Sequence, residues 1–433
     1  MRFCSTKDSR VSVSFTEAVS RGMAQDGGLF IPAEIPRCPR GFLRSIGGLA
    51  FPEISFEVAR LLLGGEIPDA DLRRIVGESV TFDAPLHRLD ESTVVLELFH
   101  GPTLAFKDFG ARFMARMMAY MHRGDRGEHT VLVATSGDTG SAVASAFHGM
   151  PGVSVILLYP SGRVSQIQES QLTSLTGNVT ALEIAGTFDD CQRLVKLAFA
   201  DREIAAGRNL TSANSINVAR LLPQTFYYFN AFARLGEMSG EIVFSVPSGN
   251  LGNLTAGLIA WKMGIPVKRF IAATNANDVV CRYLETGVYE PGRALTTLSN
   301  AMDVGDPGNL PRIRALFNDD IEAIRKAVYA SPCTDDQTRE AIAEVFLRHR
   351  YVLDPHGAVG YSALGRYRAA TGGAFTGILL ETAHPAKFID VYDPVVRGSI
   401  EVPGRLRDLL GGEKHSVKLP ARFEEVKAFL MGA

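Results

Sequence analysis

The sequence predicts an α/β fold built on mostly parallel sheets. From about residue 93 onward, short runs rich in β-branched residues alternate with stretches of helical periodicity. Several of these runs end in turns rich in glycine, serine and threonine. Ligands of open parallel sheets bind at the carboxyl ends of the strands, where such turns lie. The chain of 433 residues is also longer than one ordinary hydrophobic core, so we expect two or three domains.

Residues 1–90 are expected to form a separate N-terminal unit, because their composition and turn clusters differ from those of the later residues. Gly27, Gly28 and several prolines make the early part irregular. Leucine-rich pieces near residues 56–63 and 69–76 are then expected to be helical.

The region after residue 90 carries the strands and helices of the predicted sheets. Apolar side chains at helical spacing predict a helix over residues 107–120. Charged amphipathic helices are expected near residues 320–350 and 405–430. Short strands are predicted at residues 94–98, 131–134, 153–158, 179–184, 242–246, 270–273 and 375–380.

The composition is that of an ordinary globular protein. Hydrophobic residues make up 46% and charged residues 21%, which argues against a largely disordered chain. The formal net charge of −2, without a long basic run, predicts no nucleic-acid or anionic-membrane partner. No apolar stretch approaches the roughly 18 residues of a membrane span. Residues 1–10 lack the apolar region of a signal peptide, so we expect a cytoplasmic protein.

The five cysteines are scattered and form no Cys-x-x-Cys pair. Reduced thiols are therefore expected, and a disulfide framework or zinc site is disfavoured. The sequence also lacks His-Glu-x-x-His and Gly-x-Ser-x-Gly motifs. It predicts no metal site, and it disfavours zinc proteases and serine hydrolases.

A turn suited to a phosphate follows the strand predicted at residues 242–246. It reads Pro247-Ser248-Gly249-Asn250-Leu251-Gly252-Asn253 and leads into a helical stretch. Glycines let backbone N–H groups close around an anion, and the helix start adds unpaired donors and a positive dipole end. The turn is neither a Walker A loop nor a Rossmann Gly-x-Gly-x-x-Gly. A glycine-rich turn without a ligand is the alternative interpretation.

A second turn of similar composition follows residues 131–134. It reads Thr135-Ser136-Gly137-Asp138-Thr139-Gly140, and an alanine-rich helix comes after it. Hydroxyl groups and free N–H groups at a helix start predict a site for a carboxylate. Simple helix capping by Ser136, Asp138 or Thr139 is the alternative. With two such turns, one is available for a cofactor phosphate and the other for a substrate carboxylate.

Lys107 stands between Phe106 and Asp108 at the predicted start of a helix. Most lysines are solvated surface charges, and that is the alternative interpretation here. Apolar neighbours and a helix N-terminus both disfavour the ammonium form, as an imine-forming lysine requires. Asp108 opposes this effect unless it turns outward. An imine-forming lysine together with a separate phosphate turn indicates a pyridoxal phosphate site.

Two further strings offer polar groups. In Asn214-Ser215-Ile216-Asn217-Val218-Ala219-Arg220, a helix would place Asn217 and Arg220 on one face, where Arg220 would clamp a phosphate and Ser215 would donate to it. A capped surface helix is the alternative. The string Thr382-Ala383-His384-Pro385-Ala386-Lys387-Phe388 follows residues 375–380 and brings a hydroxyl to a strand end. We interpret its His384 and Lys387 as structural groups.

These strings closely resemble those of the threonine synthase family. The resemblance rests on the run from His100 to Phe109, on Ala134 to Ser141, on Ser248 to Asn253 and on Glu381 to Phe388. The early run Gly22-Met-Ala-Gln-Asp-Gly-Gly-Leu-Phe-Ile-Pro32 matches as well. The matching runs lie between residues 22 and 388, in the order of the family. The two runs around residues 107 and 137 are specific, whereas the turn at 248–253 is shared by fold-type II pyridoxal-phosphate enzymes.

The resemblance implies a fold-type II architecture similar to the tryptophan synthase β subunit. It consists of two mostly parallel open sheets with flanking helices, in addition to the N-terminal unit. Residues 91–433 would form the catalytic region of two interleaved α/β domains. The smaller domain would span roughly residues 108–235 and the larger one the remainder, with the active site in the cleft between them.

The resemblance also implies the role of each site residue. Lys107 would carry pyridoxal 5'-phosphate, and Thr382 would face its ring nitrogen. The substrate carboxylate would bind to Ser136, Gly137, Asp138, Thr139 and Gly140, where Asp138 replaces the asparagine usual in related dehydratases. Ser215, Asn217 and Arg220 are the candidates for the substrate phosphate. The cofactor phosphate would be held, largely through backbone N–H groups, by Gly249, Asn250, Leu251, Gly252 and Asn253.

The implied reaction converts O-phospho-L-homoserine and water to L-threonine and phosphate. Lys107, once displaced by the substrate amine, would shuttle protons while phosphate leaves the γ-carbon and water adds at the β-carbon. Successive proton transfers need a water-limited site, so we expect movement between the two α/β domains. The alternatives are another fold-type II enzyme, such as a serine/threonine dehydratase, and a binding protein without turnover. A monomer or a homodimer is expected.

Overall fold

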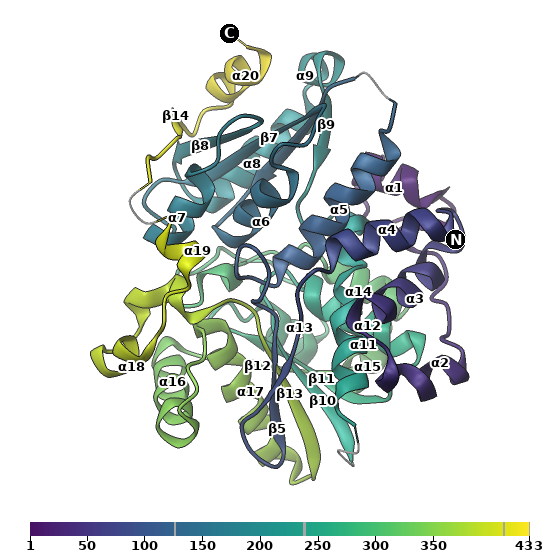
Figure 1. The fold of residues 1–433 in the computed structure, drawn as a ribbon, viewed down its shortest axis with the longest axis vertical. Coiled ribbons are helices and arrows are strands. Elements are labelled where there is room, and N and C mark those ends of the chain that lie inside the picture. The colour runs from purple at the N-terminus through teal and green to yellow at the C-terminus, as the bar shows by residue number, and fades with distance from the viewer. Residues whose placement is uncertain (125–126, 237–239, 410–411, 433) are drawn as a thin grey trace.

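Two mainly parallel sheets form the frame of the molecule. The computed structural model describes residues 1–124, 127–236, 240–409 and 412–432. Figure 1 shows the smaller sheet in the upper half and the larger sheet in the lower half, with helix α5 (Lys107–Met121) at the level between them. A small antiparallel sheet lies near the N-terminus. The predicted α/β fold with two mostly parallel sheets and an N-terminal unit is confirmed.

The larger sheet is parallel except at one edge, where β4 runs antiparallel to β5. Its order in the described residues is β12 (Val328–Pro332), β11 (Val267–Thr274), β10 (Glu241–Pro247), β13 (Phe375–Glu381), β5 (Thr93–Glu97) and β4 (Leu86–Arg88). Every residue of β13 is buried, as expected of a parallel strand covered on both faces. The helices of this half are α11 (Gln224–Arg234), α12 (Gly252–Met263), α13 (Val279–Thr286), α14 (Leu310–Leu316), α15 (Ile321–Ala327), α16 (Asp335–His349) and α17 (Pro355–Thr371).

The smaller sheet is entirely parallel in the described residues. Its order is β14 (Val417–Pro420), β8 (Val179–Ala185), β7 (Val153–Pro160), β6 (His129–Ala134) and β9 (Asn209–Ser212). The helices of this half are α6 (Asp138–Phe147), α7 (Gln166–Thr173), α8 (Phe188–Ala200), α9 (Arg202–Gly207) and α20 (Phe423–Met431). Because the strands are parallel, the turns after β6 and β7 lie at the same edge of this sheet.

The N-terminal unit joins a three-stranded sheet to several helices. The strands are β1 (Phe3–Ser5), β2 (Ser12–Val13) and β3 (Phe30–Pro32), and the helical segments are α1 (Phe15–Arg21), α2 (Arg40–Ser45), η1 (Ile46–Gly48), α3 (Phe51–Leu63) and α4 (Asp69–Ser79). Shorter segments elsewhere are α10 (Val218–Leu221), η2 (Asn300–Met302), η3 (Pro385–Val391), α18 (Pro394–Ser399) and α19 (Gly404–Arg407). No helix in the described ranges is long and apolar enough to cross a membrane.

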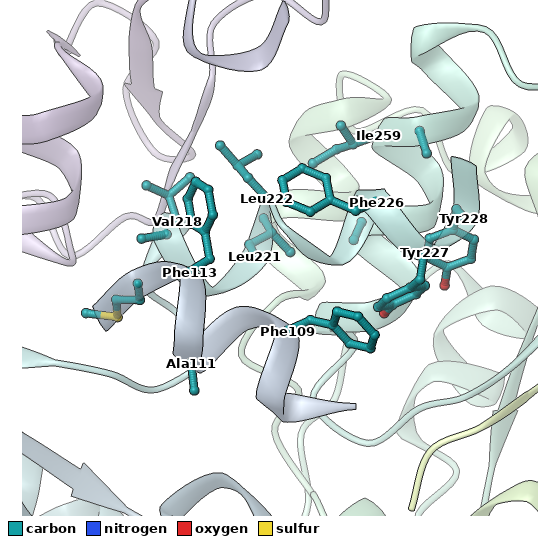
Figure 2. Close-up of a cluster of buried hydrophobic side chains, with 14 of the residues drawn as sticks. Phe109, Ala111, Phe113, Val218, Leu221, Leu222, Phe226, Tyr227, Tyr228 and Ile259 are labelled. Carbon is teal, nitrogen blue, oxygen red and sulfur yellow. The ribbon is translucent and has the colours of Figure 1, made fainter. Parts of the chain in front are cut away.

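An aromatic core fixes α5 against α10, α11 and α12 (Figure 2). The Phe113 and Phe226 rings meet edge to face with centroids 5.9 Å apart, and the Phe109 and Tyr227 rings meet at 5.6 Å. All four side chains are buried. Edge-to-face ring pairs add specific geometry to the burial of apolar area. This core therefore holds α5, which begins at Lys107, in a fixed position relative to α11.

The strands predicted from apolar runs are all present, with bounds shifted by a few residues. Strands that lack such runs, for example β9, β12 and β14, were not predicted from the sequence. Within residues 320–350, where helices were expected, β12 separates α15 from α16. Its sequence Val-Tyr-Ala-Ser-Pro is only partly buried and carries no continuous apolar run.

The C-terminal segment differs from the predicted domain division. Within residues 91–433, everything outside roughly 108–235 was assigned to the larger domain, but β14 pairs with β8 in the smaller sheet, with Val417 opposite Leu182. Helix α20 packs on α8 and α9 of the same half. The strand reads Val-Lys-Leu-Pro at an exposed sheet edge, so no hydrophobic pattern indicates its partner.

Candidate active site

A cavity lies at the carboxyl ends of strands from both sheets. Its walls include the turns that follow β6, β10 and β13, together with residues of α5 and α10. Gly137, Gly140 and Asn217 are not among its lining residues. The predicted site residues that do line it are Lys107, Ser136, Asp138, Thr139, Ser215, Arg220, Gly249, Asn250, Leu251, Gly252, Asn253 and Thr382.

Lys107 is the first residue of α5, and its side chain lines the cavity. Its Nζ lies 5.0 Å from the centre of the Phe106 ring. Burial lowers the pKa of Lys107, although the nearby Asp138 carboxylate opposes this shift. Among the described residues, Lys107 Nζ has no hydrogen-bond or ion-pair partner. The amine is therefore available as a nucleophile and is less basic than an ordinary lysine.

The β10–α12 turn, residues 247–253, presents a row of backbone donors. Leu251 adopts a left-handed conformation with φ 59°, and α12 begins at the next residue. In the described part of the chain, no hydrogen bond uses the backbone N–H groups of residues 249–253. Successive free N–H groups at a helix start form a concave anion site. The turn therefore has the geometry that a phosphate group requires.

Gly249 in this turn tolerates no side chain. A Cβ atom built there would lie 2.7 Å from Met302 Cα and 3.1 Å from Ala301 O. The segment that contains η2 thus closes directly over the turn. The free N–H groups and this close approach fit the phosphate of pyridoxal phosphate, as the sequence predicts.

Two asparagine side chains stabilise the turn through hydrogen bonds within the protein. Asn253 Nδ2 donates to Pro247 O at 2.7 Å, and Asn253 Oδ1 accepts from the N–H of Leu254 at 2.9 Å. Asn250 Nδ2 donates to Ser215 Oγ at 2.6 Å. Because these amides are engaged within the protein, the turn offers its backbone rather than these side chains to a ligand.

The β6–α6 turn, residues 135–140, is organised around Thr135. Thr135 Oγ1 accepts from the N–H groups of Gly137 at 3.0 Å and Gly140 at 2.8 Å. These two predicted carboxylate donors are therefore already satisfied inside the protein. The N–H groups of Ser136, Asp138 and Thr139 have no acceptor among the described residues. These three groups are the ones available to a carboxylate.

The Asp138 side chain forms a buried ion pair. Lys387 Nζ lies 2.7 Å from Asp138 Oδ1, and Gln168 Nε2 donates to the same oxygen at 2.9 Å. Burial raises the pKa of Asp138, but the Lys387 and Lys107 cations outweigh it and lower the pKa overall. Lys387 Nζ also donates to Thr103 O at 2.9 Å. Lys387 is thus a structural group, as interpreted from the sequence.

Of the 214–220 string, the structure brings Ser215 and Arg220 to the cavity. Arg220 is buried, its Nη1 donates to Ala213 O, and its Nε has no partner among the described residues. Burial lowers the pKa of Arg220 to about 10, so the guanidinium stays charged at neutral pH.

Asn217 lies behind the cavity wall. Its Oδ1 accepts from the N–H of Ala219 at 3.0 Å and caps α10, while its Nδ2 donates to Val19 O at 2.9 Å and to Ser212 O at 3.2 Å. Both polar atoms of the Asn217 amide are therefore engaged. As the residue before α10, Asn217 satisfies an N–H group of the first helical turn. The structure therefore gives Asn217 a capping position, away from the predicted phosphate ligands.

Thr382 lines the cavity directly after β13, and a buried carboxylate fixes its backbone. Asp354 Oδ2 accepts from the N–H groups of Thr382 at 3.2 Å and Ala383 at 3.1 Å. Asp354 Oδ1 lies 2.5 Å from His356 Nδ1, and His356 also lines the cavity. Burial raises the pKa of the neighbouring Glu381 carboxyl well above its usual range. Asp354 thus sets the position of both Thr382 and His356.

Sequence reasoning missed several lining residues. His356 follows Asp354-Pro355, an N-cap and a proline at the start of α17, which is a signal for a helix start but not for a site. Phe188 and Gln192 come from α8 of the smaller half, and residues 300–304 from an irregular segment of the larger half. No spacing or motif in these segments indicates that they meet at the cavity.

Comparisons with known proteins agree with this geometry. A family model described as pyridoxal-phosphate dependent enzyme matches residues 81–378. Models for the N terminus and the C-terminal part of threonine synthase match residues 2–80 and 357–430. The threonine synthase of Escherichia coli strain K12 is 43% identical over 432 residues, which cover 100% of this chain and 99% of the relative.

The chain belongs to the threonine synthase family. The crystal structure of threonine synthase from Escherichia coli has a TM-score of 0.92 at 42% identity, with 100% of each chain covered. That of pyridoxal-phosphate-bound threonine synthase from Brucella melitensis has a TM-score of 0.90 at 37% identity, covering 100% of this chain and 99% of the other. The chain is accordingly a pyridoxal-phosphate-dependent lyase of threonine biosynthesis.

A tomato threonine deaminase shares the fold alone. Its structure has a TM-score of 0.57 at 16% identity and covers 88% of this chain. Fold-type II architecture is therefore common to enzymes of several activities, and the threonine synthase assignment rests on the full-length relatives.

Proposed function

We propose that this enzyme converts O-phospho-L-homoserine and water to L-threonine and phosphate, with pyridoxal 5'-phosphate carried on Lys107. The observation that carries the proposal is the convergence of three groups on one cavity. These are the unpaired Lys107 amine, the free N–H groups of residues 249–253 and the buried Arg220 guanidinium. An imine-forming amine with two separate phosphate sites suits a phosphorylated amino acid.

The β10–α12 turn holds the cofactor phosphate in this proposal. Residues 249–253 line the cavity, and the amides of Asn250 and Asn253 already bond within the protein, so the backbone N–H groups of the turn are the donors available to the phosphate. The Thr382 hydroxyl, which lines the same cavity, would serve as a neutral partner for the ring nitrogen and would not hold the ring protonated. When bound, the cofactor supplies an electron sink for the loss of protons next to the substrate amine.

Lys107 acts as both anchor and proton carrier. Its side chain lines the cavity, so with the substrate bound its Nζ would be an amine placed to hold and return protons. Burial keeps the pKa of Lys107 below that of an ordinary lysine, so Nζ accepts and returns protons more readily near neutral pH. The Phe106 ring, whose centre lies 5.0 Å from Nζ, covers one side of this amine.

The substrate carboxylate binds at the start of α6 in this proposal. Ser136, Asp138 and Thr139 offer their N–H groups there, and Gly137 and Gly140 shape the turn. The Asp138 carboxylate would repel a substrate carboxylate, but its charge is matched by Lys387 at 2.7 Å. The backbone donors and the helix dipole therefore supply the attraction.

Arg220 is the proposed ligand of the substrate phosphate, together with Ser215. The Arg220 Nε is buried without a partner in the described chain, so it is available to an anion. Asn217 is left out of this proposal, because its amide caps α10 and donates to Val19 O.

We further propose that the enzyme works in the cytoplasm, as a monomer or a homodimer, and that its two α/β halves close on the substrate. The cavity takes its walls from both halves, so a relative movement changes its access to water. Product release at the end of the cycle requires the reverse movement.

The test is an assay of purified protein with O-phospho-L-homoserine that measures phosphate and threonine together. Equal amounts of both products are expected. L-threonine is the matched second substrate, because a serine/threonine dehydratase would release ammonia and a keto acid from it. Deamination of threonine without turnover of the phosphorylated substrate would overturn the proposal, and so would cofactor binding without any turnover.

A further inference from the structure

Among the described residues, the lysines and arginines that are at most 3% exposed are Lys387, Arg220 and Arg312. Lys387 is neutralised by Asp138 at 2.7 Å. Neither arginine has a carboxylate within ion-pair distance in the described ranges. A buried cation without a counter-charge is unfavourable, so proteins almost always supply one. Arg220 faces the cavity, but Arg312 lies behind its wall and has no part in the reaction proposed above.

Arg312, on α14, is bound entirely by neutral oxygen atoms. Its Nε donates to Phe30 O at 2.9 Å and its Nη2 to Ile216 O at 2.6 Å. Its Nη1 donates to Ser215 O at 3.1 Å and to Asn309 Oδ1 at 2.7 Å. The side chain is 0% exposed, and burial lowers its pKa to about 9. The guanidinium is therefore charged at neutral pH and remains uncompensated by protein groups.

The contacts of Arg312 lead directly to the β10–α12 turn. Asn309 Nδ2 donates to Asn250 O at 3.0 Å, and the N–H of Asn309 donates to the same oxygen at 3.3 Å. Ser215 Oγ accepts from Asn250 Nδ2 at 2.6 Å. Both residues that bind Nη1 of Arg312 thus also bind Asn250. One shell of side chains separates the cation from the free N–H groups of the turn.

We propose that Arg312 is a positioning residue whose buried charge is the counter-charge of the cofactor phosphate held in the β10–α12 turn. The inference rests on the proposed role of that turn. Through Asn309 and Ser215 the guanidinium orients the turn, and through its charge it favours a doubly charged phosphate over a neutral group. In a low-dielectric interior, such an attraction acts beyond direct contact. Two uncompensated arginines thus correspond to two phosphates, Arg312 to that of the cofactor and Arg220 to that of the substrate.

A purely structural Arg312 makes a different prediction. If the side chain only joined Phe30, Ser215 and Asn309, its replacement would weaken the binding of any ligand in the cavity to a similar degree. If the charge matters, the replacement weakens binding of a phosphorylated ligand specifically. Pyridoxal 5'-phosphate and pyridoxal differ only in that phosphate, so the ratio of their affinities separates the two roles.

The experiment measures dissociation constants of both compounds for the full-length protein after removal of its cofactor. Arg312→Gln keeps amide donors without charge, and Arg312→Lys keeps charge without the planar fork. Arg112→Gln is the control, because Arg112 also donates to backbone oxygens, those of Ser79 and Glu78, away from the cavity. We expect the preference for the phosphorylated compound to fall roughly tenfold in Arg312→Gln, as for one charge pair about 12 Å apart at an effective dielectric near 20. We expect it to be kept in Arg312→Lys and in the control.

An unchanged preference in Arg312→Gln, or an equal loss for both compounds, would overturn the inference while leaving the proposed turn intact. A parent protein that does not prefer the phosphorylated compound would contradict the proposed role of the turn itself. Circular dichroism reports whether each variant is folded. If Arg312→Gln does not fold, a folded Arg312→Lys that has lost the preference would overturn the inference, and one that keeps it would support it.

Discussion

Lys387 Nζ and Asp138 Oδ1 lie 2.7 Å apart, with side chains that are 0% and 3% exposed. Lys387 belongs to η3, just after the central strand β13 of the larger sheet, and Asp138 is the first residue of α6 in the smaller half. The pair therefore ties the two halves together at the cavity. It also neutralises the carboxylate that stands where the substrate carboxylate is proposed to bind.

Removal of the Lys387 charge should destabilise the fold. Lys387→Met leaves the Asp138 carboxylate buried without its cation, which typically costs about 3–5 kcal/mol. Urea denaturation at pH 7 measures the free energy of unfolding. Lys326→Met, at an exposed position on α15, is the control and should be close to neutral. An unfolding free energy equal to that of the parent would show that the pair is dispensable.

Lys107→Ala should abolish threonine formation in a folded protein. The variant loses both the covalent anchor and the proton carrier, so turnover should fall by more than about 10³-fold. The visible absorbance of the bound cofactor should disappear, while circular dichroism stays that of the parent. Turnover at the parent rate would remove Lys107 from the chemistry.

Loading of the cofactor should depend on pH through Lys107. The neutral amine is the nucleophile, and burial holds the pKa of Lys107 below the ordinary value of 10.5. Because the amine is neutral above its pKa, the loading rate of cofactor-free protein should rise with pH and reach half of its maximum below pH 10.5. Stopped-flow absorbance at a series of pH values measures this rate. A midpoint at or above 10.5 would contradict the lowered pKa.

Gly249→Ala should weaken cofactor binding. The added Cβ would lie 2.7 Å from Met302 Cα, so either the turn or the segment above it must move. Displacements of this size in a binding site reduce function by up to about 10²-fold. Gly365→Ala on α17 is the matched control, because a Cβ there meets no atom within 4 Å. Titration of both cofactor-free variants with pyridoxal phosphate should separate them, and equal affinities would argue against a tight turn.

Arg220→Met should raise the KM for O-phospho-L-homoserine. Loss of one member of a buried charge pair costs about 2 kcal/mol or more, which corresponds to roughly 30-fold. Affinity for homoserine without the phosphate should change far less, because that ligand has no group for Arg220. Steady-state kinetics and competition by homoserine provide the two values. A similar loss of affinity for both ligands would indicate that Arg220 maintains the structure of the site instead of binding the phosphate.

The sequence predicted those strands and turns whose structure is determined by residues close together in the chain. Continuous apolar runs located β10 and β13, since parallel strands covered on both faces need apolar side chains throughout. The motif around Lys107 and the turn at residues 247–253 predicted residues that the structure brings to one cavity.

The features that were missed depend on contacts between distant segments. Arg312 resembles an ordinary surface arginine on a short helix, but in the fold its buried guanidinium donates to the carbonyl oxygens of Phe30 and Ser215, which are distant in the sequence. Asn217 resembles a ligand but is used as a helix cap. In both cases the amino-acid type permits two roles, and only the tertiary arrangement decides between them.

The pairing of β5 with β13 has a consequence for how the protein is made. Residues 93–97 find their parallel partner only at residues 377–381, so a nascent chain exposes the inner edge of β5 while nearly 300 further residues are synthesised. At roughly 5–20 residues per second, a ribosome needs tens of seconds for that length. An unpaired strand edge exposed for so long is prone to aggregation. The catalytic cavity therefore forms late in synthesis. The amount of folded enzyme in a cell depends on protection of that edge until β13 has been made.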